Sequence, residues 1–279
     1  MRNKGRLVIL GSGGFISGYV EKIIKKSNIK ILKLPRKKID LKKESSVKKL
    51  LKIIKKGDII FFAAAEAPVK NESMLLNNLL MAKHVCEVIK KKSPSFLLYL
   101  SSDAVYSDSK NKIDETSLTA PESLHGIMHL TREIMLENVC KKKLCIARPT
   151  LVYGKGDPHN GYGPNRFIKL IKDKKDIELF GKGEELRDHV WINDVSEAIS
   201  KLIISRNVGK YNLVTGKVIS FNEISRKLLK FYGKKNKIIY KKRVGPMPHN
   251  GYRAFKRSYF EKIYPKFKFR SFEDVINSF

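Results

Sequence analysis

Residues 6–18 read RLVILGSGGFISG, an apolar run that leads directly into a cluster of glycines. The run at 6–10 predicts a buried β-strand, and the apolar spacing that follows predicts a helix over 14–26. Glycine permits a tight turn at Gly11, and at Gly14 it lets the backbone approach a pyrophosphate that the helix N-terminus can bind. The stretch therefore predicts a dinucleotide-binding strand-turn-helix unit; a plain tight turn between strand and helix is the alternative.

The same alternation of short apolar runs and helical segments continues along the chain. Predicted strands occupy 29–34, 58–62, 96–100 and 144–147, the last stopped by Arg148-Pro149, and predicted helices occupy 44–56, 69–92 and 121–141. Further strands are predicted at 187–190 and 211–214, and a further helix at 221–232. This rhythm predicts an α/β fold, a Rossmann-type doubly wound parallel sheet with a small C-terminal substrate-binding lobe. The expected dinucleotide-binding domain is 1–155 with returning segments near 187–215, and the smaller lobe is 156–186 and 216–279.

The chain is strongly basic. Lys and Arg number 58 against 27 Asp and Glu, which gives a formal net charge of +31. Such a charge attracts polyanions at low salt. The lysines are nevertheless scattered over the solvent faces of many predicted helices, and no RRM, KH, zinc-finger or basic-zipper pattern is present. We therefore expect no specific nucleic-acid partner.

Membrane and disulfide-rich classes are not indicated. The longest apolar stretches, at 59–65 and 96–100, are far shorter than the roughly 20 residues that cross a bilayer. The apolar run at 7–10 is too short for a signal peptide. Cys86, Cys140 and Cys145 show neither a disulfide framework nor the spacing of a zinc site. We expect a cytoplasmic protein with reduced thiols and no membrane partner.

Taken in order, the motifs resemble those of the extended short-chain dehydrogenase/reductase family, the NAD-dependent epimerase/dehydratase group that acts on nucleotide sugars. Its GxxGxxG pattern is matched by Gly11 and Gly14, with Ser17 at the third place and Gly18 expected to relieve the crowding there. The other matching segments are Ile39-Asp40-Leu41, Ala63-Ala64-Ala65, Asn78, Ser101 to Tyr106, Arg148 to Gly154, Leu179 to Gly183 and Arg187 to Val195. The resemblance covers nearly the whole chain and is nearer to dTDP-4-dehydrorhamnose reductases than to the longer UDP-galactose 4-epimerases.

The resemblance implies an NAD(P) cofactor and the residues that bind it. These are Gly11, Gly14, Phe15, Ile16, Arg36, Asp40, Leu41, Ala63, Ala64, Ala65, Asn78 and His129. An acidic residue about 20 positions after the glycines would accept the ribose hydroxyls of NAD, whereas arginine accommodates the extra phosphate of NADP. The sequence has Arg36-Lys37-Lys38 there and no acid, which favours NADP(H).

The chain departs from the family at the pair expected to carry the chemistry. The family has Tyr-x-x-x-Lys on a helix, and this sequence has His125 and His129 at those places. The spacing of four keeps both side chains on one helical face. Three interpretations remain open: His125 carries the proton of the reacting oxygen, the site binds its ligands without turnover while His129 holds the ribose, or the two histidines bind a metal. No third metal ligand is evident, so no metal is expected.

Two residues before the predicted helix bear on the type of reaction. Ser102 matches the family position that hydrogen-bonds the reacting sugar oxygen, where a hydroxyl can donate and accept. Asp103 is a further candidate for substrate contact. Related 4,6-dehydratases carry an acid pair at this point, whereas Ala104 cannot protonate a leaving hydroxyl. Sugar dehydration is therefore not expected.

Three residues of the predicted substrate lobe are candidates for binding the nucleotide. By resemblance, Arg187 meets the diphosphate, which a guanidinium matches in a fork, and Asn165 and Arg166 belong to a loop that closes on the nucleotide. Alternatively, Arg187 pairs with Asp188 or Asp194 and Asn165 caps a helix.

The sequence thus predicts an NAD(P)-dependent nucleotide-sugar epimerase or reductase that transfers hydride at a sugar carbon. A catalytically degenerate protein that binds a dinucleotide or nucleotide sugar is the alternative. A nucleic-acid-associated Rossmann protein is a third hypothesis, which the net positive charge suggests. The expected partners are a nucleotide-diphosphate sugar and a second copy of the chain. The helices that begin near Val69 and Pro121 resemble the pair through which family members dimerise.

Overall fold

Six strands form the central sheet of the computed structural model, in the order β10-β5-β4-β3-β1-β2. They are β1 (Leu7–Leu10), β2 (Ile31–Leu34), β3 (Ile59–Phe62), β4 (Phe96–Leu100), β5 (Leu144–Pro149) and β10 (Gly209–Leu213). β1 pairs in parallel with β2 on one side and β3 on the other, and β4 and β5 continue the parallel array. Because the strand order reverses beside β1, the carboxyl ends of β1 and β3 form the edge where such sheets bind ligands. The predicted α/β Rossmann-type fold is confirmed.

The structure describes residues 5–158, 161–233, 236–257 and 259–278, so parts of the predicted smaller lobe lie outside it. The chain divides into two units, which we call unit 1 and unit 2. Unit 1 comprises Met1–Ser107, Leu118–Arg148 and Ser196–Tyr211 and contains most of the central sheet. Unit 2 comprises Asp108–Ser117, Pro149–Val195 and Asn212–Phe279.

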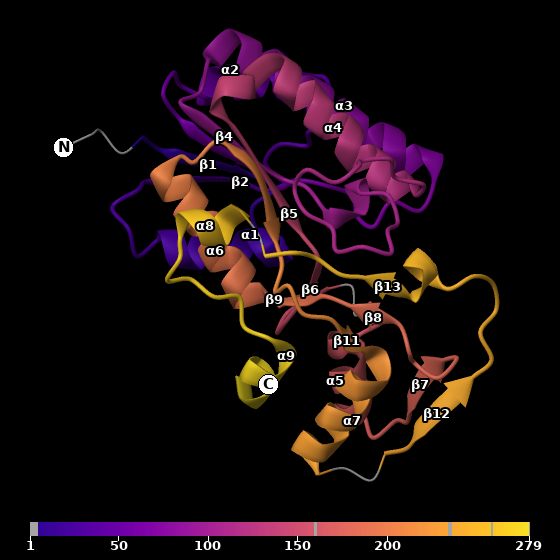
Figure 1. The fold of residues 1–279 in the computed structure, drawn as a ribbon. Helices are drawn as coiled ribbons and strands as arrows, with labels where there is room; N and C mark the ends of the chain where they lie inside the picture. Colours follow the sequence, from indigo (N-terminus) through magenta and orange to yellow (C-terminus); the bar gives the residue numbers. More distant parts are fainter. Residues whose placement is uncertain (1–4, 159–160, 234–235, 258, 279) are drawn as a thin grey trace. The chain divides into compact units, whose positions relative to one another are not determined.

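Helices cover both faces of the central sheet (Figure 1). α2 (Ser45–Ile53), α3 (Glu72–Lys92) and α4 (Leu124–Cys140) lie on one face, and α1 (Phe15–Ile24) and α6 (Ile192–Ser205) on the other. The first face is closed by a core of aliphatic and aromatic side chains from the strands and from α2, α3 and α4, including Val8, Leu50, Phe62, Val85 and Leu136. Near-continuous burial along β1 and β3 is typical of strands covered on both faces.

Unit 2 is built from short strands and helices. β6 (Leu151–Tyr153) pairs with β9 (His189–Trp191), β7 (Ile177–Phe180) with β12 (Ile238–Lys241), and β8 (Leu186–Arg187) lies between β11 (Ile219–Ser220) and β13 (Tyr252–Arg253). Its helices are α5 (Pro164–Lys172), α7 (Phe221–Tyr232), α8 (Tyr259–Ile263) and α9 (Phe272–Val275). Short 3₁₀ helices occur at η1 (Asp103–Val105) and η2 (Lys141–Lys143) in unit 1, and at η3 (Pro248–Gly251) and η4 (Ile276–Ser278) in unit 2. An aromatic core holds unit 2 together, with Phe167, Phe221 and Phe272 at its centre.

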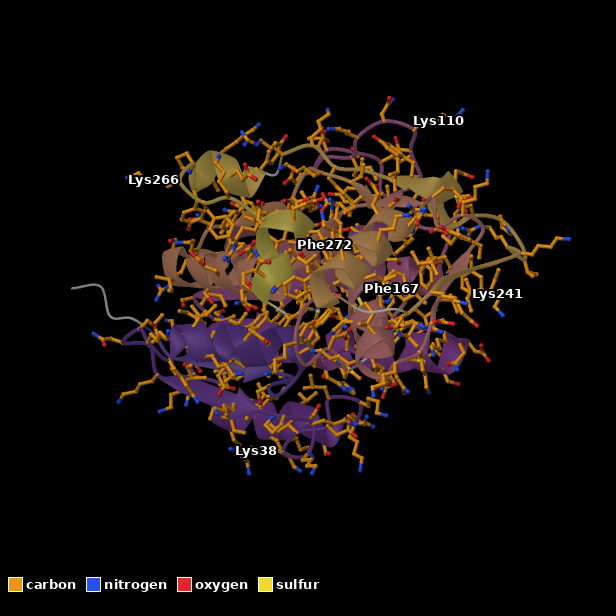
Figure 2. The ribbon with its side chains drawn as sticks, turned by 90° about the horizontal axis from the view of Figure 1, so that it is seen from below. Lys38, Lys110, Phe167, Lys241, Lys266 and Phe272 are labelled. Atoms are coloured by element: carbon orange, nitrogen blue, oxygen red, sulfur yellow. The ribbon has the colours of Figure 1, made fainter. Side chains whose placement is uncertain are left out.

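The side chains show where the excess positive charge lies. Figure 2 shows Lys38, Lys110, Lys241 and Lys266 extending away from the ribbon, whereas Phe167 and Phe272 lie inside. Exposed lysines on many elements therefore contribute to the positive charge. Among the described helices, none is both long and apolar enough to cross a membrane.

Several element boundaries differ from those predicted. β5 runs through Arg148 to Pro149 instead of stopping before them, because proline is tolerated at the end of a strand, where it breaks few ladder bonds. The predicted strand at 187–190 is two short strands, β8 and β9, and α6 follows β9 directly without having been predicted. The helix predicted over 221–232 has those bounds as α7.

Candidate functional site

The turn after β1 passes very close to the segment after β3. Gly11 has a φ of +87°, and a Cβ at this position would lie 2.6 Å from Cα of Ala64. Only glycine accepts both conditions without strain. The turn then opens outward, since nothing lies within 4 Å of a Cβ built on Gly13, and Gly14 is the N-cap of α1.

Ser17 secures this turn from inside. It is buried, and its hydroxyl donates to the carbonyl of Gly11 at 2.9 Å and accepts from the N–H of Gly14 at 3.1 Å. The serine therefore replaces the packing of a third glycine with two hydrogen bonds. The expectation that Gly18 relieves crowding is wrong, because no described atom lies within 4 Å of a Cβ built there, apart from the backbone of its own helix and its chain neighbours.

Phe15 and Ile16 occupy the first turn of α1 and are partly exposed. Amides in the first turn of a helix have no intrahelical acceptor, so they can bind an anion. Asp40 accepts from the N–H of Lys42 at 3.2 Å, which forms a local turn. Leu41 is buried, and its carbonyl lies 2.8 Å from Nδ1 of His84.

Glu66, which follows Ala63, Ala64 and Ala65, has two basic side chains and one amide around its carboxylate. Lys42 Nζ lies 2.9 Å from its carboxylate and Arg36 Nη1 lies 3.6 Å from it, while Asn77 donates to it at 3.0 Å. Burial opposes the ionised form, but Lys42, Asn77 and Arg36 outweigh it and lower the pKa of Glu66. The side chain of Arg36 is 66% exposed, so this long contact leaves it accessible to an anion.

Asn78 and Arg132 fix the chain after β3. The fully buried amide of Asn78 accepts from the N–H of Glu66 at 3.1 Å and donates to its carbonyl at 3.0 Å. Arg132 on α4 donates to the carbonyl of Ala64 at 2.9 Å and to Oδ1 of Asn78 at 3.3 Å. Sequence reasoning missed Arg132, although an arginine between apolar helix positions is a signal that a buried cation is present.

The two histidines of α4 lie together, as their spacing predicts. Their ring centroids are 4.7 Å apart, at an interplanar angle of 87°. His129 is buried, and its Nδ1 lies 2.7 Å from the hydroxyl of Tyr99 on β4. His125 is partly exposed and accepts a long hydrogen bond of 3.5 Å at Nδ1 from the N–H of Val69. Tyr99 was not a predicted site residue.

η1 packs directly against the start of α4. A Cβ on Gly126 would lie only 2.1 Å from the carbonyl oxygen of Ala104, so glycine is required for this approach. Ser102 accepts from the N–H of Ala104 at 3.2 Å and lies 3.4 Å from the carboxylate of Asp103. Burial lowers the pKa of His125, and the nearby charge of Asp103 partly opposes that change. The structure therefore brings Ser102, Asp103 and His125 to one place at the end of β4.

The end of β4 is anchored by a buried ion pair. Arg148 and Glu133 are each 1% exposed, and their side chains meet at 2.5 Å. Glu133 also accepts from the hydroxyl of Ser101 at 2.5 Å, and Arg148 donates to the hydroxyl of Tyr106 at 2.8 Å. These bonds fix Ser101, just before Ser102, and Tyr106, four residues after it.

In unit 2, Arg187 belongs to a basic cluster with His249 and Arg253. Arg187 and Arg253 are buried, and Asp108 accepts from Arg253 at 3.1 Å and contacts Nδ1 of His249. Burial, followed by the charges of Arg187 and Arg253, lowers the pKa of His249, while Asp108 raises it. Of the neighbouring carboxylates, Asp188 accepts from Thr215 and Asp194 pairs with Arg270.

Asn165 and Arg166 begin α5. The amide of Asn165 accepts from the N–H of Gly154 at 3.0 Å and donates to Asp157 at 2.7 Å, while Arg166 is exposed. Gly163 is the N-cap of α5, so the alternative that Asn165 caps this helix is wrong. Among the described residues, no three or more His, Cys, Asp or Glu side chains are grouped to hold a metal ion.

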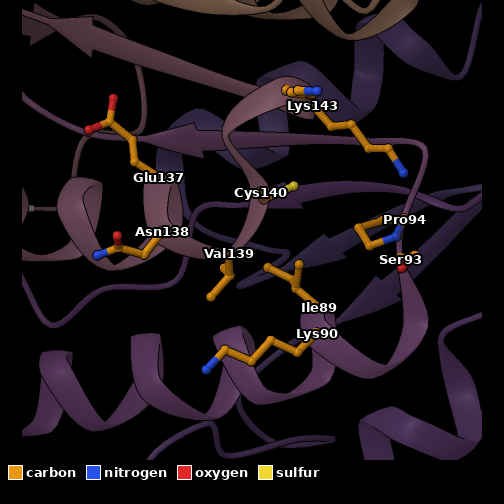
Figure 3. A pocket seen from close by; sticks show the side chains of 10 residues that line it. Ile89, Lys90, Ser93, Pro94, Glu137, Asn138, Val139, Cys140 and Lys143 are labelled. Atoms are coloured by element: carbon orange, nitrogen blue, oxygen red, sulfur yellow. The ribbon is translucent and has the colours of Figure 1, made fainter.

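A cavity of about 300 Å³ lies elsewhere in unit 1 (Figure 3). Its lining includes Ile89 and Lys90 of α3 and Glu137 and Cys140 of α4. Ser93 and Pro94, just before β4, complete this wall, so the cavity lies at the amino ends of the strands. It is therefore separate from the site at their carboxyl ends.

The family model described as the NAD dependent epimerase/dehydratase family matches residues 7–213. The chain belongs to this family. A relative named an uncharacterized UDP-glucose epimerase, YtcB of Bacillus subtilis (strain 168), is 27% identical over 207 residues, which are 70% of this chain and 64% of that protein. The chain thus spans less than two thirds of that relative's length.

Solved structures of epimerases and reductases share the fold of this epimerase/dehydratase family member. The UDP-glucose 4-epimerase of Thermus thermophilus, in complex with NAD, has a TM-score of 0.83 at 20% identity, over 97% of this chain and 96% of that one. The dTDP-4-dehydrorhamnose reductase of Bacillus anthracis str. Ames, in complex with NADP, also has a TM-score of 0.83 at 20% identity, over 100% and 98%. At such identities the likeness establishes the fold alone.

Proposed function

We propose that the protein transfers hydride between the nicotinamide of NAD or NADP and a carbon of a nucleotide sugar, as an epimerase or reductase. The observation that carries this proposal is the packing of η1, which follows Ser102 at the carboxyl end of β4, against the start of α4, which brings the charge of Asp103 close to His125. A partly exposed imidazole and a hydroxyl are together the groups that a reacting sugar oxygen needs. The family and the glycine turn support the same proposal.

The residues after β1 fit a dinucleotide. Gly13 is exposed and has open space where a side chain would stand, and the first turn of α1 offers N–H donors to a pyrophosphate. A bound nicotinamide supplies or accepts the hydride. The exposed guanidinium of Arg36 supports a preference for NADP(H), since it can pair with a phosphate.

Ser102 and His125 have distinct roles in this proposal. The Ser102 hydroxyl orients the sugar oxygen by hydrogen bonding. Nε2 is the nitrogen of His125 that the N–H of Val69 leaves free for the sugar oxygen. To accept a proton at Nε2 the neutral ring must carry its hydrogen on Nδ1, so the long 3.5 Å contact with Val69 is given up in that step. Burial lowers the pKa of His125, so the ring is neutral at pH 7 and can accept a proton.

We assign substrate binding to unit 2 and dinucleotide binding to unit 1. Arg187 and Arg253 bring two guanidinium groups close to His249, and Asp108 pairs with Arg253 and contacts His249. A nucleotide diphosphate is an anion that two guanidinium groups match in forked geometry. We therefore propose a nucleotide-diphosphate sugar as the substrate class, with Arg187 as its principal contact and Asn165 and Arg166 contributing from the start of α5.

The experiment begins with denatured protein and mass spectrometry of the released nucleotides. NAD(H) or NADP(H) in near-stoichiometric amount is the expected result. The purified protein is then screened against nucleotide-sugar substrates with NADH and NADPH, in parallel with His125→Phe. Turnover by the native protein and its loss in the variant support the proposal, whereas full activity of His125→Phe would exclude His125 as the proton carrier.

A second candidate is a binding protein that retains the ligand sites without turnover. The observation that favours it is the absence of tyrosine and lysine at 125 and 129. The double variant His125→Tyr with His129→Lys separates the two candidates. A gain of redox turnover supports a degenerate binding protein, and a loss supports a working histidine site.

We also propose that the protein is a homodimer joined through α3 and α4. Each helix exposes a pair of apolar side chains at helical spacing, Leu76 and Leu80 on α3 and Ile127 and Ile134 on α4. A two-fold interface buries the same patch of both copies. Light scattering should give a dimer mass for the native protein and a monomer mass for Leu76→Glu with Ile134→Glu; a native monomer would contradict this proposal.

A further inference from the structure

A buried cation lies on α4 near the histidine pair, although α4 carries no lysine at position 129. Arg132 is three residues beyond His129 and is fully buried. Its guanidinium carbon lies 4.3 Å from the ring centroid of Phe62 and 5.0 Å from that of Tyr99. Both distances are within the range of a cation–π contact.

No carboxylate among the described residues lies within 4.0 Å of the Arg132 nitrogens. Its hydrogen bonds go instead to the carbonyl of Ala64, the amide oxygen of Asn78 and the sulfur of Met128, and Nε is buried without a partner. A buried guanidinium without a carboxylate is costly, and the two rings offset part of that cost. Since neither solvent nor a counter-ion screens it, its charge acts on the groups around it.

His129 is a group whose protonation state the charge of Arg132 affects. The hydroxyl of Tyr99 lies 2.7 Å from Nδ1, and no other partner of that hydroxyl is found in the described part of the chain. Burial raises the pKa of Tyr99, so the phenol keeps its proton, and we assign that proton to the hydrogen bond with Nδ1. In the neutral ring, Nε2 then carries the hydrogen.

The charges around His129 act in one direction. Burial has the largest effect, followed by the charges of His125 and Arg132 on the same helix, and together they lower the pKa of His129 well below its ordinary value. Tyr99 is the titratable group that faces it from β4. Asp103 in η1 acts on His125, and Glu133 acts on Tyr99.

We propose that Tyr99 and Arg132 are positioning residues that hold His129 uncharged, as a hydrogen-bond donor through Nε2. The guanidinium of Arg132 supplies the positive charge that α4 lacks at position 129. The inference rests on the proposed function, because it states how the same site operates with histidines in place of a tyrosine and a lysine. His125 remains the group of the pair that exchanges a proton with solvent or substrate.

The test is nuclear magnetic resonance of the full chain labelled with ¹⁵N in its histidine rings, without substrate. In the native protein, His129 should remain neutral from pH 5 to pH 9, with its hydrogen on Nε2. The pH series is extended below 5 as far as the protein stays folded, so that the titration midpoint of His129 is read directly. There Arg132→Met, which keeps an unbranched side chain, should raise that midpoint by about one unit, and Arg132→Lys should restore it. Tyr99→Phe should release Nδ1 and populate the second tautomer.

Three results would overturn the inference. They are an ordinary titration of native His129, a native hydrogen on Nδ1, and an unchanged midpoint in a folded Arg132→Met variant. If Arg132→Met does not fold, the native spectrum and Tyr99→Phe still decide. The predicted spectra in a protein without dinucleotide-dependent turnover would support this inference and remove the proposed function. An ordinary titration of His129 in an active enzyme would remove this inference and leave the proposed function in place.

Discussion

Cα of Ala64 lies 2.6 Å from the point where a Cβ on Gly11 would stand. Gly11→Ala therefore forces the turn after β1 away from β3, at a φ of +87° that alanine rarely adopts. We expect a loss of at least about 2 kcal/mol in the free energy of unfolding. Gly18→Ala is the matched control and should stabilise α1 by roughly 0.5 to 1 kcal/mol. Urea unfolding measures both, and equal effects of the two variants would contradict the proposed packing of the turn.

The cofactor preference depends on Arg36. Its side chain is 66% exposed and makes only a 3.6 Å contact with Glu66. Arg36→Ala should raise the Kd for NADPH about tenfold, because a charged hydrogen bond is lost, and should leave the Kd for NADH within about twofold. The neighbouring Lys37→Ala is the control. Equal weakening of both dinucleotides in a fluorescence titration would remove the NADP(H) preference.

Buried His189 should make stability depend on pH. Burial, followed by the charge of Arg187, lowers its pKa to about 3, below the ordinary value of about 6.5. Below pH 6.5 the unfolded chain therefore takes up a proton that the folded protein does not, and the free energy of unfolding falls as the pH falls.

Between pH 6.5 and 5.0 this one histidine should account for about 2 kcal/mol of lost stability. Most carboxyl groups titrate below that window. His189→Leu should lose about 2 kcal/mol less than the native protein over the same interval, as measured by urea unfolding at each pH. Identical losses would show that His189 is protonated in the folded protein.

The buried ion pair of Arg148 and Glu133, which anchors the chain around Ser102, should contribute to the free energy of unfolding. Glu133→Gln leaves the 1% exposed guanidinium of Arg148 without its counter-charge, so we expect a loss of about 3 to 5 kcal/mol. Glu133→Leu combined with Arg148→Met removes both charges and should recover part of that loss. A double variant less stable than either single one would contradict this account.

The succession of strands and helices along the chain was predictable because its determinants are local. Apolar runs, Gly11 and Gly14 and the helical spacing up to α3 all lie within short windows of sequence. α6 escaped prediction because it begins at Ile192 directly after β9, with neither glycine nor proline between them. The pairing of β7 with β12 joins segments about 60 residues apart, for which no local signal exists.

In the candidate site, too, contacts set by local spacing could be predicted, whereas contacts between distant segments could not. The spacing of His125 and His129 placed both on one helical face, and their ring contact follows from it. The contact of Tyr99 with His129 could not be predicted, since it depends on how β4 packs against α4. Burial of Arg132 likewise depends on Phe62 and Tyr99, which lie on two different strands.

In the proposed function, hydride transfer is coupled to a proton that His125 carries. The direct measurement uses NADPH or NADH deuterated at C4 of the nicotinamide, a nucleotide 4-keto sugar and mass spectrometry of the sugar product. We predict one deuterium on the sugar carbon with the native protein and none with His125→Phe that still binds the dinucleotide. No deuterium with the native protein across the panel of sugars, or equal transfer by His125→Phe, would contradict the account.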